Sequence, residues 1–475
     1  MPEEYRTNRT KRSETFWVLL LMMFLLLTLS GCGSSDQSYS IAGNITSGGA
    51  PIAGVTVTLS GGPSGGTSVT DANGNYGFGG LSSGTYTITP MLAGYTFIPS
   101  NRPAYLYGNN AEGFNFYASR GISISTTDHT LYAKSDGTVW AWGRNNKSQL
   151  GDGTTTDSST PVQSAAGVLS GVTAVAAGNE HSLALKGDGT VWAWGSNSNG
   201  QLGDNSTTNR PAPVQVSGLT NVQAIAAGVN FSLALKNDGT VWAWGLNSSG
   251  QLGNGTSTDQ WIPVQTAFSG GVTAIAAGFD HAVAMTNLHQ VWTWGNNSSG
   301  QLGNGQTANS SLPILVGSGV TGALAVSAGN QFTVVLVSSY LSSYLWSWGN
   351  NSNGQLGDGT NALRYYPVTV TGLTNMTMTA IVSGDAHSLA LKNDGTLWAW
   401  GSNNHGQLGD GTKTDRWTPV QVTGLTGEQA VTAGYQDSFA SATVGTVKAW
   451  GNNMYGQLGG GAIPEQLTPV AITLP

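Results

Sequence analysis

Two short motifs near the N-terminal end have the form of catalytic or metal-binding sites. Residues 62–66 read Gly-Pro-Ser-Gly-Gly and fit G-x-S-x-G, which in hydrolases sets a nucleophilic serine on a strand-to-helix turn. This copy lies in a glycine-rich loop between short strands, so we interpret it as a chance match. Residues 71–74, Asp-Ala-Asn-Gly, have the form of part of a calcium loop. Ca²⁺ takes six to eight oxygens and no bidentate glutamate follows at loop distance, so we expect a hairpin turn.

Other candidate groups recur at fixed positions of a repeated phrase. Four histidines share one position: His129, His181, His281 and His387. A zinc ion needs its ligands about 2.0–2.1 Å from one centre, which four separate repeats cannot supply, so we expect each ring to hydrogen-bond within its own loop. Another position carries Asp152, Asn254, Asn304, Asp358 and Asp410. These Gly-Asp-Gly-Thr-like runs indicate turns rather than calcium sites, and we expect neither a metal nor a cofactor.

The repeated phrase determines the fold class that we expect. It occurs seven times, starting at Trp142, Trp194, Trp244, Trp294, Trp348, Trp400 and Trp450. A period near 50 residues indicates an array in which each repeat buries its apolar face against a neighbour. In the second repeat we predict strands over 174–178, 181–186, 190–195 and 213–216. Trp192 and Trp194 lie at i and i+2, so both rings project from one face, where we expect them to pack on the next blade.

The motifs A-G-x-x-H-S-L-A-L, N-D-G-T-V-W-A-W-G and N-x-x-G-Q-L-G resemble the regulator-of-chromosome-condensation (RCC1) repeat. That resemblance implies an all-β, seven-bladed β-propeller of four-stranded blades over residues 119–475. Its family includes a nucleotide-exchange factor for a nuclear GTPase, and a secreted bacterial inhibitor of β-lactamases has a similar propeller. Three blades depart from the pattern. In blade 1, Thr126 takes the position that Gly178 holds in blade 2, and in blade 5 residues 338–344 replace a short turn. In blade 7, Lys448 takes the position of the first tryptophan, and we expect this lysine to lie at the closing seam.

A separate small domain is predicted over residues 39–118. Short alternating strands over 41–46, 55–59, 67–70, 75–78, 85–89 and 113–117 are divided by Gly- and Asn-rich turns, which predicts a β-sandwich. The stretches 51–57, 70–76, 80–86 and 94–97 resemble the carboxypeptidase regulatory-like, transthyretin-like domains. The resemblance implies a non-catalytic spacer, and some relatives with this carbohydrate-binding-like fold bind sugars.

The N-terminal segment predicts an exported lipoprotein. Four basic residues precede an apolar run over 16–29, which is too short to span a membrane, and Leu29-Ser30-Gly31-Cys32 then looks like a bacterial lipobox. We expect residues 1–31 to be a lipoprotein signal peptide, Cys32 to be lipidated, and residues 32–38 to form a tether. Cys32 is the only cysteine of the chain. Gly33 rather than Asp after it favours the outer membrane if the cell has one.

Composition limits the partners that the chain can have. After residue 31 it holds 13 Lys+Arg and 21 Asp+Glu, a formal charge of −8, which argues against nucleic acid. Over the whole chain, a hydrophobic content of 39% and 16 tryptophans argue against disorder.

The predicted binding surface is one loop face of the propeller. In an up-and-down blade, the loops after strands one and three emerge on the same side. The candidate binding residues there are Glu180, Phe231, Phe279, Asp280, Phe332, Asp385, Tyr435 and Gln436. Aromatic anchors within a polar rim are typical of protein interfaces.

We therefore expect a membrane-anchored, non-catalytic binding or scaffold protein of the cell envelope, whose loop face contacts a protein partner. The alternative is a carbohydrate-binding or adhesion protein. An enzyme with its site at the propeller mouth would need titratable residues that break the repeat, and none is visible. Nucleotide exchange on a GTPase would rest on the family name alone.

Overall fold

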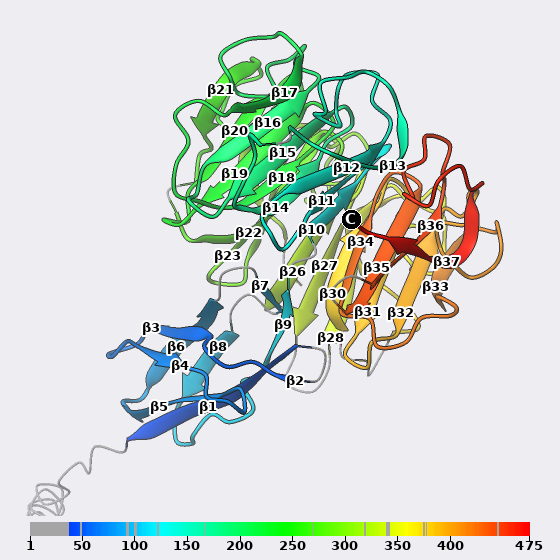
Figure 1. Cartoon of the computed structure of the whole chain (residues 1–475). Coiled ribbons are helices and arrows are strands. Elements are labelled where there is room, and N and C mark those ends of the chain that lie inside the picture. Colours follow the sequence, from blue (N-terminus) through cyan, green and yellow to red (C-terminus); the bar gives the residue numbers. More distant parts are fainter. Residues whose placement is uncertain are drawn as a thin grey trace, which may run out of the picture.

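The computed structural model describes residues 38–47, 50–91, 95–98, 102–120, 123–165, 167–268, 270–317, 320–338, 343–373, 376, 378–443 and 446–475. It has two β-rich parts, a small domain and a seven-bladed propeller (Figure 1). The predicted fold class is confirmed. Cys32 and the predicted signal peptide lie outside the described residues. Within those residues, no helix has the length and apolar character needed to cross a bilayer.

The small domain consists of two sheets that share one core. The first contains β1 (Tyr39–Ser47), β2 (Ala50–Pro51), β5 (Asn75–Leu81), β7 (Tyr95–Ile98) and β9 (Phe116–Arg120). The second contains β3 (Thr56–Gly61), β4 (Gly66–Val69), β6 (Gly84–Met91) and β8 (Arg102–Leu106). Ile41, Val57, Ile88 and Phe116 are fully buried between them, because alternate residues of each strand face the shared core.

Each propeller blade is one contiguous segment of four antiparallel strands, ordered from the axis outward. The innermost strands are β10 (Ser123–Thr126), β14 (Val172–Ala177), β18 (Val222–Ala227), β22 (Val272–Ala277), β26 (Ala323–Ala328), β30 (Met378–Ser383) and β34 (Ala430–Ala433). The second strands are β11 (His129–Ala133), β15 (His181–Lys186), β19 (Phe231–Lys236), β23 (His281–Thr286), β27 (Phe332–Ser338), β31 (His387–Lys392) and β35 (Asp437–Thr443).

The outer half of each blade is built in the same way. The third strands are β12 (Val139–Gly143), β16 (Val191–Gly195), β20 (Val241–Gly245), β24 (Val291–Gly295), β28 (Ser343–Gly349), β32 (Leu397–Gly401) and β36 (Thr446–Gly451). The fourth are β13 (Ser158–Gln163), β17 (Arg210–Gln215), β21 (Gln260–Gln265), β25 (Ser310–Leu315), β29 (Arg364–Thr369), β33 (Arg416–Gln421) and β37 (Gln466–Thr473). Each fourth strand contains a proline, which an outer edge tolerates because no further strand needs its missing N–H.

The tryptophan pair packs on the preceding blade, so the expectation that it packs on the next one is wrong. Trp194 and Trp192 of blade 2 lie in a cluster with Leu131, Val139 and Leu150 of blade 1. The handedness of the ring decides which neighbour this face meets, and the i, i+2 spacing alone does not.

The ring closes without exchanging a strand between its two ends. Trp142 of blade 1 packs with Val447, Ala449 and Leu458 of blade 7, as the other tryptophans pack on their preceding blades. Its indole N–H donates to the carbonyl of Gln457, with 2.7 Å between Nε1 and O. The closing contact therefore repeats the contact made at the six covalently connected seams.

Candidate binding face of the propeller

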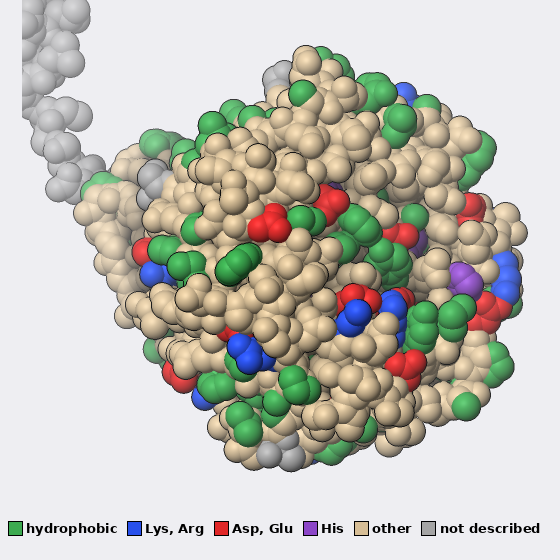
Figure 2. All heavy atoms as spheres, turned by 90° about the horizontal axis from the view of Figure 1, so that it is seen from above, with side chains coloured by type: hydrophobic (Ala, Val, Ile, Leu, Met, Phe, Trp, Pro, Cys, Tyr) green, Lys and Arg blue, Asp and Glu red, His purple; other side chains and the backbone are tan. Residues whose placement is uncertain are grey.

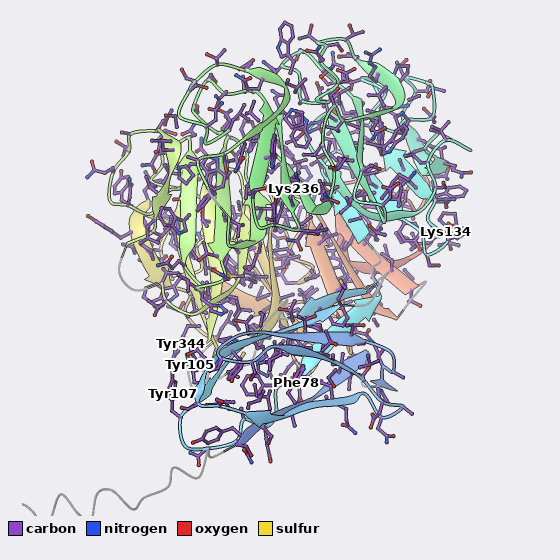
Figure 3. All side chains as sticks on the ribbon, turned by 90° about the vertical axis from the view of Figure 1, so that its left-hand side faces the viewer. Phe78, Tyr105, Tyr107, Lys134, Lys236 and Tyr344 are labelled. Atoms are coloured by element: carbon purple, nitrogen blue, oxygen red, sulfur yellow. The ribbon has the colours of Figure 1, made fainter. Side chains whose placement is uncertain are left out.

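One face of the ring carries the loops between the first and second strands and those after the third strands. The small domain lies on the other side, toward which the β27–β28 hairpin of blade 5 points (Figures 1 and 3). Figure 2 views the molecule from above, away from the small domain, and shows acidic side chains near the middle of that face. The loop face is therefore open to a partner.

A well of about 180 Å³ lies on the propeller axis where the innermost strands end. Its wall is made of the small residues that end these strands, such as Ala177, Ala227 and Ala277. Side chains of the following loops stand at its mouth: Asn179, Val229, Phe279, Asn330, Asp385 and Tyr435. Small residues are needed in the wall because seven strands converge on one axis.

Hydrogen bonds between neighbouring loops fix the mouth of the well. The Val229 amide donates to the Phe279 carbonyl at 3.1 Å, and the Asn330 amide donates to the Asp385 carbonyl at the same distance. The Asn330 side-chain amide also donates to Asp385 Oδ1 at 2.8 Å. The rim is therefore held together by contacts from blade to blade, which positions Phe279 and Asp385 before any partner arrives.

Acidic groups dominate the surroundings of the well. Arg144 reaches Asp128 at 3.2 Å and Glu180 at 3.4 Å, so one cation serves two carboxylates. Burial raises the pKa of Asp280, and burial together with the nearby charge of Asp128 raises the pKa of Asp385, against the opposing effect of its hydrogen bond from Asn330. An excess of negative charge in a concave site attracts cationic groups.

The acidic groups around the well also affect the pKa of Tyr435. Burial and the carboxylates of Asp385, Asp128 and Asp280 raise the pKa of its phenol to about 12. The hydroxyl therefore stays protonated at neutral pH. Tyr435, Phe279, Asp280, Asp385, Glu180 and Gln436 are all partly exposed, so six of the eight predicted binding residues remain available on this face.

Phe231 and Phe332 are not available, and their prediction as binding residues is wrong. Both side chains are fully buried. Each begins a second strand at the position that His181 holds in blade 2, and its ring points into the seam with the next blade. Gly228 shows how closely the ring approaches its own loop, because a Cβ there would lie 2.0 Å from Phe231 Cε1.

The histidines at that position bond across the seams rather than only within their own loops. His181 Nε2 lies 3.0 Å from Ser232 Oγ of the next blade, and His129, His281 and His387 make the equivalent contact. The Ser232 hydroxyl donates its only proton to the Gln201 carbonyl at 2.9 Å, so His181 Nε2 must carry the proton of the other bond. Burial lowers the pKa of all four histidines well below neutral pH, so the rings are neutral structural groups.

The glutamine carbonyl of each Gln-Leu-Gly loop completes the seam, a role that sequence reasoning missed. The Gln149 carbonyl accepts both the Ser182 hydroxyl at 2.7 Å and the Trp194 indole N–H at 2.8 Å. Ser182 and Trp194 face each other across β15 and β16, which places both donors at one acceptor. We call this arrangement of histidine, hydroxyl, carbonyl and indole the seam lock.

The seam lock contains a complementary exchange that was visible in the sequence. Where blade 3 has Phe231 in place of histidine, blade 4 has Ala282 in place of serine. Only the Trp294 indole then reaches the Gln251 carbonyl, at 2.9 Å. Phe332 of blade 5 has no such exchange, because blade 6 keeps Ser388, whose hydroxyl donates to the Gln355 carbonyl at 3.0 Å.

Blade 1 and blade 7 also depart from expectation. Thr127, not Thr126, takes the place of Gly178, because its amide bonds to the His129 carbonyl and the turn of blade 1 is one residue shorter. Lys448 bonds to the carbonyl of Gly424 and to Glu428 Oε1 in the connection between blades 6 and 7. The expectation that Lys448 marks the closing seam is therefore wrong.

The family of the propeller follows from its repeats and its geometry. The sequence-family model of the RCC1-like domain matches residues 118–429 of the chain, and that of the carboxypeptidase regulatory-like domain matches residues 40–99. The chain belongs to the RCC1-like domain family. Its small domain is similar to carboxypeptidase regulatory-like domains.

Several proteins of known sequence share part of the RCC1-like propeller. An RCC1 domain-containing mitochondrial protein of Arabidopsis thaliana, RUG3, is 36% identical over 107 residues, which are 22% of this chain and 23% of that protein. The human E3 ubiquitin-protein ligase HERC2 is 34% identical over 108 residues, 23% of this chain and 2% of its own length. The match thus spans less than a quarter of either relative.

Solved structures match over a longer stretch. Yeast RCC1 (Prp20), in a complex with Kap60, has a TM-score of 0.63 at 23% identity and covers 74% of this chain and 85% of its own. Human WBSCR16 has a TM-score of 0.60 at 25% identity and covers 69% and 89%. These likenesses establish the shared propeller fold.

The remaining motifs of this RCC1-like chain form turns. Asn197 Oδ1 accepts the Leu202 amide, and its Nδ2 donates to Asp204 Oδ1 and to two loop carbonyls, so this asparagine organises the whole loop. Arg210 pairs with the same Asp204 at 2.7 Å. Among the described residues no group of three or more His, Cys, Asp or Glu side chains is placed to hold a metal ion.

The two N-terminal motifs behave similarly. Asp71 Oδ1 accepts the amides of Asn73 and Asn75 at 2.9 and 2.8 Å, so residues 71–74 form a turn. This turn connects β4 and β5, which belong to different sheets, so the expectation of a hairpin is wrong. Ser64 Oγ lies 3.4 Å from the hydroxyl of Tyr86 in a loop between β3 and β4, and no helix follows it.

Proposed function

We propose that this chain is a non-catalytic binding protein whose propeller loop face contacts a protein partner. The observation that carries the proposal is the open axial well, with Phe279, Tyr435 and Asp385 at its mouth, on the face away from the small domain. Aromatic and charged groups in a concave surface provide the anchors from which protein interfaces draw most of their affinity. The small domain then serves as a spacer.

A non-catalytic role is supported by the use of the repeated polar groups. The seam-lock histidines are buried and neutral, and burial lowers the pKa of His181 to about 4. Asp204, Asp358 and Asp410 are each held by an arginine six residues later. Groups tied in this way are not free to exchange protons with a substrate.

Relatives of the propeller are consistent with a protein partner. Yeast RCC1 (Prp20) was solved bound to Kap60, and a second structure of Prp20p from Saccharomyces cerevisiae was described together with its binding to Gsp1p and histones. The acidic mouth favours a partner that presents a basic surface, because complementary charge speeds association and rejects acidic competitors. The identity of the partner is not implied by the relatives.

We further propose that Cys32 anchors the protein to the cell envelope through lipid, with residues 33–38 as tether. Two or more acyl chains hold a protein stably on a membrane. When the chain is produced in bacteria with radiolabelled palmitate, label should be incorporated by the natural sequence and lost in Cys32→Ser. Equal labelling of both would contradict the anchor and leave the loop-face proposal unaffected.

Site-specific photo-crosslinking in the native cell tests the loop face. A crosslinking amino acid at Gln436 should capture one protein, which is then identified by mass spectrometry. The same amino acid at Asp188, on an exposed hairpin of the opposite face, is the matched control. Capture of the same proteins from both positions, or of none from Gln436, would contradict a partner on the loop face.

A second candidate function is carbohydrate binding by the small domain. Tyr105 and Tyr107 lie two residues apart on the same side of the chain at β8 and are 60% and 68% exposed. Exposed rings in this arrangement can stack on sugars (Figure 3). Retention on cell-wall polysaccharide that is lost in Tyr105→Ala with Tyr107→Ala would favour this role, and unchanged retention would exclude these tyrosines.

A further inference from the structure

The axial well offers more recognition chemistry than the fold requires. The innermost strands need only small residues in its wall, yet three successive blades contribute Asn330, Asp385 and Tyr435 to the mouth, and blade 4 adds Phe279. None of these four is repeated in every blade. The mouth therefore has a chemical character of its own.

The negative charge of this mouth is only partly compensated. Asn330 occupies Oδ1 of Asp385, and no ion pair to Asp385 or Asp280 is present within the described residues. Asp280 Oδ1 is shielded from solvent and lacks a hydrogen-bond partner in that part of the chain. Arg144 pairs with Asp128 and Glu180, so its charge is already shared between two carboxylates. A partly buried carboxylate without a counter-charge is stabilised by a cation supplied from outside.

The neighbouring rings favour the same kind of ligand. The faces of Phe279 and Tyr435 are electron-rich, and a cation within about 6 Å of a ring centre is attracted to it. A carboxylate and two rings around one small space therefore match an ammonium or a guanidinium group better than an apolar or anionic group.

We propose that the well admits one lysine or arginine side chain of the partner protein, with its charged end beside Asp385 and the rings of Phe279 and Tyr435. This inference rests on the proposed protein-binding function and names the group that is recognised. The well holds about 180 Å³, enough for one long side chain but not for a folded segment.

Fluorine NMR on the full chain labelled with 3-fluorotyrosine tests the proposal without knowledge of the partner. Tyr435→Phe assigns the resonance of Tyr435. The probes are the N-acetyl methylamides of lysine, arginine and norleucine, the last being a neutral chain of similar length. We expect lysine or arginine to shift the Tyr435 resonance saturably, and the shift to weaken as salt is added. Norleucine should leave it in place. An equal effect of norleucine would overturn the proposal, because the well would then be merely apolar.

Two variants locate the recognised charge and ring. Asp385→Asn should weaken lysine binding at least fivefold, whereas Asp188→Asn, which removes one charge from the opposite face, should leave it within twofold. Phe279→Leu should weaken binding about threefold or more. Equal affinities of Asp385→Asn and Asp188→Asn would overturn the assignment. If Asp385→Asn unfolds, Asp385→Glu and Phe279→Leu still test it.

The outcome separates this inference from the proposed function. If crosslinking at Gln436 captures a partner whose affinity is unchanged by Asp385→Asn, the protein-binding role stands and the cation site is wrong. If the lysine probe binds but Gln436 captures no protein, the cation site stands and the proposed partner is wrong.

Discussion

The seam lock shows how a residue that looks catalytic can be purely structural. A histidine, a serine and a carbonyl oxygen lie in line, but the serine proton goes to the Gln201 carbonyl and the histidine proton goes to the serine. No basic nitrogen faces the hydroxyl, so the serine is not activated as a nucleophile. The same atoms instead connect blades 1, 2, 4 and 6 to the blades that follow them.

Removing one hydroxyl from this lock should destabilise the ring. In Ser232→Ala, the buried Nε2–H of His181 loses its acceptor, which costs about 1–3 kcal/mol. The midpoint of urea unfolding, followed by tryptophan fluorescence, should fall accordingly. Ser198→Ala, at an exposed loop position, should change it little. Equal midpoints for Ser232→Ala and the natural chain would show that the contact adds no stability.

The buried histidines should make the protein sensitive to acid. Burial lowers the pKa of His181 and His387 to about 4 and of His129 and His281 to about 3, below the unfolded value near 6.5. The unfolded chain then binds more protons as the pH falls below 6.5, so stability is lost in that direction. Each histidine should account for about 2 kcal/mol between pH 7 and pH 5.

Blades 3 and 4 provide the variant that tests this pH dependence. His181→Phe with Ser232→Ala reproduces the natural pair Phe231 and Ala282. The loss of stability between pH 7 and pH 5 should shrink by the share of one histidine. The raised pKa values of Asp280 and Asp385 act in the opposite direction but are common to both proteins. An unchanged pH profile would mean that His181 does not titrate on unfolding.

At the scale of the element, the Gly-Gln-Leu-Gly loop is shaped by the tryptophan of the next blade. A Cβ on Gly253 would lie 2.7 Å from Trp294 Nε1, and its φ of +64° already disfavours a side chain. Gly218 has a similar φ of +67° but open space around it. Comparing substitutions at the two glycines therefore distinguishes the cost of backbone strain from the cost of the steric contact.

Alanine at these two glycines should have unequal effects. Gly218→Ala should cost about 1–2 kcal/mol of unfolding free energy for the left-handed conformation alone. Gly253→Ala should cost about 1–3 kcal/mol more, because the added methyl displaces a packed indole. Thermal and urea unfolding measure both. Equal losses would show that the loop can move away from Trp294.

The strands of the repeat were predictable from the sequence, and so were β1, β3, β4, β5 and β6 of the small domain. The predicted second strand of blade 2 agrees with β15, because a hairpin turn fixes its end. β7 and β8 of the small domain were missed, and in β8 the strand pattern is interrupted by Pro103. The mouth of the well was half predictable. The positions of the loops were evident from the sequence. Phe231 is the first residue of its second strand and is buried, whereas Phe279 precedes its second strand by two residues and is partly exposed. The hydrophobicity of the two residues is the same and does not reveal this difference.

At the scale of the whole molecule, the seam between blades 7 and 1 lacks the covalent connection that joins the blades at the other six seams. Its innermost strands, β10 and β34, have four residues each, whereas the other innermost strands have six. A space of about 40 Å³ lies beside them, lined by Ile124, Val431 and Val447. We therefore expect the ring to open first at this seam.

Hydrogen–deuterium exchange measures that opening. Peptides that cover β10 and β34 should exchange faster than those that cover β18 and β22 under native conditions. A disulfide engineered across the closing seam should slow their exchange and raise the thermal unfolding temperature. Uniform protection of all seven innermost strands would show that the closing seam is as strong as the connected ones.

Because every blade is built from one stretch of chain, the position of the ring's ends is independent of its geometry. A gene cut between blades 3 and 4 and rejoined between blades 7 and 1 would encode the same ring with new termini. The small domain could then be attached beneath any blade, facing a different part of the rim. The orientation of the acidic mouth toward a membrane or a neighbouring protein thus depends on the blade to which the small domain is attached. That blade can change without altering any packed residue.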